Sequence, residues 1–106
     1  MGKDTEIREQ VDVINAKIDQ LKERLNMIPA EVEQLELGRR KLRAKTIELS
    51  KKMQEEGKIQ ESSDFVEKSN LELRGITRNV EDKFKEQSRI QAEINKLEKK
   101  RAELLA

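Results

Sequence analysis

The sequence predicts an all-α fold, an antiparallel two-helix coiled-coil hairpin, on three observations. Apolar residues recur at alternating steps of four and three along both halves of the 106-residue chain. One glycine, Gly57, separates the two halves. With 42% charged residues and only Phe65 and Phe84 as aromatics, the chain has too few bulky apolar side chains to enclose a globular core. An apolar seam between two helices needs far fewer of them.

The first helix is expected over residues 4–56, because a single heptad register runs through this segment. Spacing of 3.5 residues that persists over so many turns is the strong form of the coiled-coil signal. Arg39 and Thr46 are the polar members of the seam. The apolar members are Ile7, Val11, Ile14, Ile18, Leu21, Leu25, Ile28, Val32, Leu35, Leu42, Leu49 and Met53.

A turn is expected over residues 57–61, followed by a second helix over 62–105. Gly57 suits the left-handed residue that ends a helix, and Ser62, Ser63 and Asp64 are candidate caps for the next one. A start at Ile59 remains open. The apolar seam of this helix comprises Val66, Leu73, Ile76, Val80, Ile90, Ile94, Leu97 and Leu104, interrupted by Ser62, Ser69, Lys83, Gln87 and Arg101.

The two seams match when the chain reverses at Gly57, because helices joined by a short turn run antiparallel. Facing residues then have numbers that add to about 115, which pairs apolar with apolar in six layers. These layers are Leu49–Val66, Leu42–Leu73, Leu35–Val80, Leu25–Ile90, Leu21–Ile94 and Ile18–Leu97. The same register places Thr46 opposite Ser69, Arg39 opposite Ile76, Arg101 opposite Ile14, Arg24 near Glu93, and Glu31 against Glu86.

Residues 1–106 are accordingly expected to form a single hairpin domain, although pairing between helices of two chains remains an alternative. A hairpin buries only one seam, so a second expectation is that two hairpins dimerise into a four-helix bundle. Apolar residues off the seam are available for such a contact or for another protein. They are Val13, Met27, Leu37, Ile47, Ile59, Phe65 and Leu71.

Irregular residues of both helices fall at one level of this pairing. Pro29 interrupts the first helix pattern, and either a continuous bent helix or a fresh helix capped near Asn26 fits the sequence. Two interpretations of these irregular residues are open. One is a partner-docking site at Pro29, Val32, Lys83, Phe84 and Gln87. The other is register specification by polar seam residues, which fix the alignment at a cost in stability.

Composition excludes several classes of chemistry. The chain has no Cys and no His, so it has no thiolate nucleophile, no Cys or His zinc site and no imidazole base. We expect no enzyme activity, no cofactor and no metal. The segments are too polar for a membrane span, and we expect a soluble intracellular protein whose partner is another protein or a second copy. The net charge of +1 gives little attraction to RNA, although Arg39, Arg40, Lys41, Arg43 and Lys45 form a basic segment that is a candidate nucleic-acid contact.

One segment suggests a family. The stretch from Glu56 to Ser63, followed by Phe65, Val66 and Glu67, resembles the turn between two long helices in the LUC-seven family of splicing factors. Residues 16–25 are similar to the start of that family's coiled coil. The resemblance implies a coiled-coil region of a nuclear pre-mRNA splicing factor that associates with the snRNP recognising the five-prime splice site. Gln60 departs from it, because the family has an acidic residue there.

Overall fold

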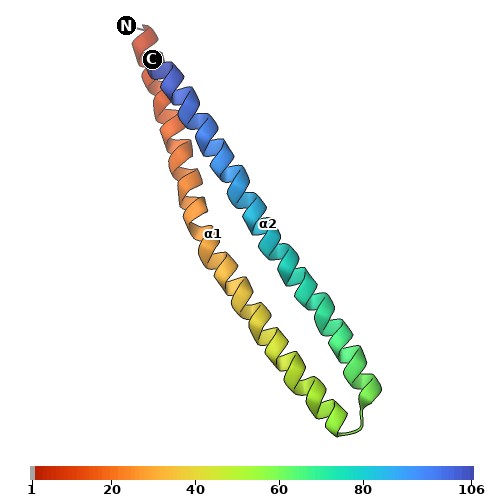
Figure 1. Cartoon of the computed structure of the whole chain (residues 1–106). Helices are drawn as coiled ribbons and strands as arrows, with labels where there is room; N and C mark the ends of the chain where they lie inside the picture. Colours follow the sequence, from red (N-terminus) through yellow and green to blue (C-terminus); the bar gives the residue numbers. More distant parts are fainter. Residues whose placement is uncertain (1) are drawn as a thin grey trace. The chain divides into compact units, whose positions relative to one another are not determined.

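Two long helices make up the computed structural model, which describes residues 2–106. Helix α1 spans Gly2–Glu55 and helix α2 spans Ile59–Leu105 (Figure 1). The described residues contain no β-strand. The predicted all-α two-helix hairpin is therefore confirmed.

The reversal between the helices occurs at Gly57, which has a φ of +77°. The Gly57 N–H donates to the Gln54 carbonyl at 3.1 Å, and the Lys58 N–H donates to the Met53 carbonyl at 2.8 Å. These two bonds form the Schellman motif, which satisfies carbonyls that a helix end leaves without partners. Glycine adopts the left-handed conformation without the steric cost that a Cβ atom would bring.

The turn is shorter than predicted, because α2 begins at Ile59 rather than at Ser62. The Ser62 N–H donates to the Lys58 carbonyl at 3.0 Å, so the first turn of α2 already forms at Lys58. The expected turn over residues 57–61 is thus wrong, and the earlier of the two possible starts is correct. Ser62 lies inside the helix, with its side chain in the seam.

Pro29 lies within the unbroken helix α1. The interpretation of a continuous helix through this residue is therefore confirmed, and a fresh helix starting near Asn26 is excluded. The loss of one backbone hydrogen bond at proline is tolerated because the same apolar register continues on both sides of it.

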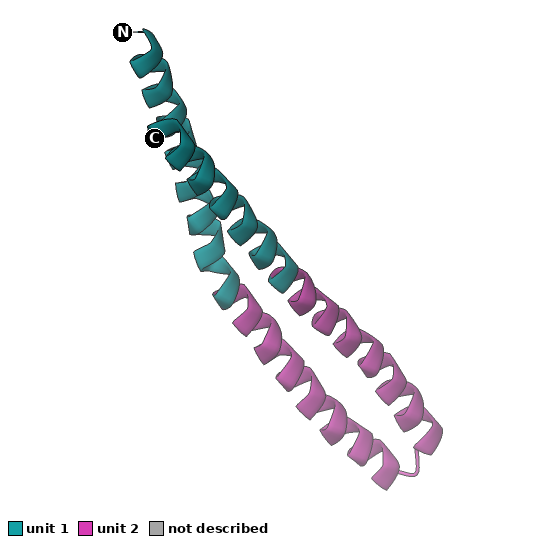
Figure 2. Ribbon diagram, turned by 45° about the horizontal axis from the view of Figure 1, so that its top comes forward, with its two compact units in different colours: residues 1–29, 84–106 teal, residues 30–83 magenta. Residues whose placement is uncertain are grey.

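The chain divides into two compact units (Figure 2). Unit 1 contains residues 1–29 and 84–106, and unit 2 contains residues 30–83. In each unit a segment of α1 runs antiparallel to a segment of α2. In unit 1 the beginning of α1 and the end of α2 lie at the same end of the helix pair, as an antiparallel arrangement requires (Figure 1).

Every seam position predicted from the sequence is buried or half-buried. The deeply buried residues nevertheless differ between the units. Unit 1 buries isoleucines, namely Ile14, Ile18, Ile28, Ile90 and Ile94. Unit 2 buries Val80 together with three hydroxyl side chains, Thr46, Ser62 and Ser69. The polar seam residues Thr46, Ser62 and Ser69 therefore lie in the interior.

Polar contacts within each unit agree with the predicted register. The Arg101 Nη1 atom donates to Asn15 Oδ1 at 2.7 Å in unit 1, next to the predicted facing residue Ile14. The Arg39 Nη1 atom donates to Thr77 Oγ1 at 3.3 Å in unit 2, next to the predicted Ile76. In both cases the aliphatic stem lies on the seam while the guanidinium reaches the flank.

Candidate functional site

The residues predicted to dock a partner are divided between the two units. Pro29, Phe84 and Gln87 belong to unit 1, whereas Val32 and Lys83 belong to unit 2. Pro29 is exposed, and half of the Phe84 side chain is exposed, at 51%. The docking site stays a prediction.

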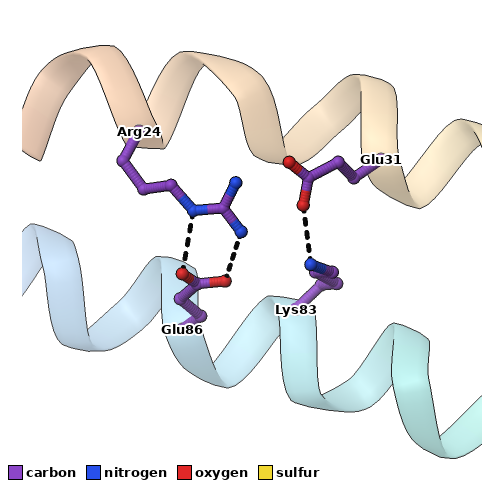
Figure 3. Close-up of polar contacts among 4 residues, drawn as sticks. All are labelled: Arg24, Glu31, Lys83 and Glu86. Atoms are coloured by element: carbon purple, nitrogen blue, oxygen red, sulfur yellow. Dashed lines mark hydrogen bonds and ion pairs between the residues drawn. The ribbon is translucent and has the colours of Figure 1, made fainter.

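Lys83 is an ion-pair partner in unit 2 rather than an uncompensated seam charge. Its Nζ atom lies 2.6 Å from Glu31 Oε1, and both side chains are about two-thirds buried (Figure 3). A groove of about 460 Å³ beside this pair is lined by Ala30, Glu31, Gln34, Leu35 and Lys83. Because the cation has a specific partner from the facing helix, its position supports the register interpretation.

Arg24 forms a two-pronged ion pair with Glu86 in unit 1. Its Nε and Nη2 atoms donate to the two carboxylate oxygens at 2.9 and 2.8 Å (Figure 3). The sequence placed Arg24 near Glu93, one heptad farther along α2, and the structure corrects this. A residue that flanks the seam lies between two possible ion-pair partners on the facing helix, which are one heptad apart. The Arg24 side chain extends toward one of them, Glu86. Glu31 and Glu86, which the sequence placed against each other, belong to different units, and within its own unit each carboxylate is paired with a cation.

The basic segment of α1 is only partly available to a ligand. Arg39 is half-buried and hydrogen-bonded to Thr77 and to the carboxylate of Glu36. The other four predicted nucleic-acid contacts are exposed, namely Arg40, Lys41, Arg43 and Lys45. Arg39 is therefore a structural residue, and its neighbours are the surface charges.

A cationic surface that sequence reasoning missed joins one residue of this segment to α2. Arg43 lines a depression of about 440 Å³ in unit 2 together with Arg74 and Arg78. Asn70, Leu73, Thr77 and Glu81 complete its wall. The side chains of the three arginines form no hydrogen bond or ion pair with other residues in the described range 2–106. The sequence could have indicated this surface through two features taken together. These are the spacing of four between Arg74 and Arg78 and the predicted Leu42–Leu73 layer.

This depression continues into a second one on the same side of unit 2. The second has a volume of about 400 Å³ and shares Arg43, Asn70 and Leu73 with the first. Its remaining wall is formed by Thr46, Ile47, Ser50, Lys51, Gln54 and Val66. We call the two together the arginine groove. Its guanidinium groups can donate paired hydrogen bonds to carboxylate or phosphate oxygens.

Neither described helix has a stretch apolar enough to cross a lipid bilayer. Across residues 2–106 no three His, Cys, Asp or Glu side chains gather as a metal-binding group. No family model, curated protein or solved structure matches this chain.

Proposed function

We propose that this chain is a noncatalytic coiled-coil module that binds an α-helical segment of another protein and serves as a scaffold or spacer. The observation that carries the proposal is that the paired helices bury their apolar seam and still leave large apolar side chains exposed outside it. A partner that covers such side chains removes apolar surface from water, which favours association.

Exposed apolar side chains support the same function. Ile47 is 64% exposed, Leu71 61% and Val13 56%. These residues lie outside the seam that the two helices bury against each other. A third helix laid beside such a pair buries its own apolar stripe, which is the common way in which helical proteins recognise one another.

A photo-cross-linking experiment tests this function. A photoreactive amino acid at Ile47 captures the neighbouring protein in cells, and a photoreactive residue at the exposed Lys99 of unit 1 serves as the position control. The protein captured only from position 47 is then purified and titrated against the intact chain. A binary complex with a Kd of about 10 µM or tighter supports the proposal. Capture of RNA alone, or no binary complex with the purified protein, contradicts it.

The second candidate is the coiled-coil region of a nuclear, snRNP-associated splicing factor. It is supported by the resemblance of residues 56–67 and by the exposure of Arg40, Lys41, Arg43 and Lys45. The test is binding of the chain to purified snRNP particles. Replacing Arg40, Lys41 and Lys45 by Glu should abolish binding, whereas replacing Lys96, Lys99 and Lys100 should not. Unchanged binding after the first replacement contradicts this candidate.

A further inference from the structure

We propose that the arginine groove of unit 2 binds an acidic amphipathic α-helix of a partner protein. This inference rests on the proposed function, because it names the partner chemistry and the surface of a helix-binding module. In this groove unpaired cations and an exposed apolar side chain occur together.

The first argument is charge. Arg43, Arg74, Arg78 and Lys51 line the groove, against the single carboxylate of Glu81. None of these four cations has an ion-pair partner among residues 2–106. The flanking cation Arg24 and the seam cations Arg39 and Lys83 differ in this respect, because each is paired with a glutamate. A partner with carboxylates would supply the counter-charges that the hairpin itself does not provide.

The second argument is the apolar part of the groove. Ile47 is largely exposed, and the half-buried Val66 and Leu73 line the groove with it. Ile47 lies four residues after Arg43 on the same helix, so the apolar and cationic side chains are neighbours on one face. A helix that carries Leu or Ile one turn away from Glu or Asp reproduces this spacing on the partner side.

The same features favour a protein helix over nucleic acid. Single-stranded nucleic acids bind to grooves in which aromatic side chains stack on the bases. No aromatic residue lines the arginine groove. Ile47, Val66 and Leu73 would give no advantage to a phosphate backbone, whereas they match the apolar stripe of a helix.

A selection experiment tests the proposal with the intact chain. The probe is a displayed library of three-heptad helices with Leu or Ile at the core positions and Glu, Lys, Gln or Ser at the flanking ones. The proposal expects enrichment of Glu over Lys at the flanks. It also expects the selected peptides to bind the Arg74→Glu/Arg78→Glu variant at least about tenfold more weakly than the unmodified chain.

Two control variants separate a groove contact from general charge attraction. The Lys96→Glu/Lys99→Glu variant carries the same charge change on exposed residues of unit 1 and should bind as the unmodified chain does. Ile47→Ser should weaken binding about tenfold, and Val13→Ser, at another exposed apolar residue, should not. Circular dichroism of each variant, with unchanged helicity, confirms that these surface changes leave the fold intact.

These outcomes test the acidic-helix inference separately from the proposed helix-binding function on which it rests. Enrichment of basic peptides, or equal loss in both charge variants, overturns the acidic-helix inference and leaves the helix-binding function standing. Absence of any enriched peptide, together with failure of the cross-linking experiment, overturns both. Binding of a polyuridylate strand that is tighter than that of the selected peptides, and lost in Arg74→Glu/Arg78→Glu, assigns the groove to RNA and overturns the inference.

Discussion

The side chain of Ser62 in α2 is hydrogen-bonded to both the side chain and the backbone carbonyl of Ser50 in α1. The two Oγ atoms are 2.8 Å apart, and Ser62 Oγ donates to the Ser50 carbonyl at 3.2 Å. The Ser50 hydroxyl therefore acts as the donor between the two side chains. Ser62 is 1% exposed, so this contact fastens the helices in the interior of unit 2, close to the turn.

Replacing Ser62 by Ala should destabilise the hairpin by about 1 kcal/mol, because a satisfied buried hydroxyl is lost. The neighbouring Ser63 is exposed, and Ser63→Ala should change stability by less than about 0.5 kcal/mol. Urea denaturation followed by circular dichroism at 222 nm measures both. Equal effects of the two replacements would show that the buried contact contributes nothing specific.

Gly57→Ala should destabilise the turn by about 1 kcal/mol through the backbone alone. A Cβ atom at Gly57 would meet no other atom within 4 Å, so the cost arises from the positive φ. Gly38 and Gly75 lie inside helices and are equally open, and Gly38→Ala and Gly75→Ala should each stabilise the protein by about 0.5–1 kcal/mol. Thermal unfolding of the three variants supplies the comparison, and a stabilising Gly57→Ala would disprove the assigned turn conformation.

The Arg24–Glu86 pair should show a coupling of about 1 kcal/mol in a double-mutant cycle with Arg24→Gln and Glu86→Gln. Its two parallel hydrogen bonds and its partial burial favour a measurable coupling. The Lys22–Glu98 pair is the control, since it is longer, at 4.0 Å, and more exposed. Its coupling should be smaller and should disappear in high salt. If Arg24 coupled to Glu93 instead, the sequence-derived pairing would be the correct one.

Ile94→Ala should destabilise the protein by about 2–4 kcal/mol, because Ile94 is 2% exposed and its truncation opens a cavity in the seam. Val13→Ala, at an exposed position in the same unit, should cost less than about 0.5 kcal/mol. The measurement is the midpoint of urea unfolding. A small effect at Ile94 would contradict the seam assignment in unit 1.

The candidate sites were harder to predict than the seam, and the reason is geometric. The register predicted which residues face each other, but the direction of a long side chain depends on its rotamer. Arg39 could be recognised as basic from the sequence, yet only the structure shows it bound to Thr77 and Glu36. Arg43 is far in sequence from Arg74 and Arg78, and it joins them only when the two helices pair.

The sequence by itself determined the two helices, the reversal at Gly57 and the alignment of the two seams. These follow from apolar periodicity and from the special backbone freedom of glycine, both of which are local properties. Tertiary structure decided which glutamate Arg24 binds, that Ser62 links the helices instead of capping one, and where the unpaired arginines meet. Such choices arise between side chains on facing helices, where several partners lie within reach and packing selects one of them.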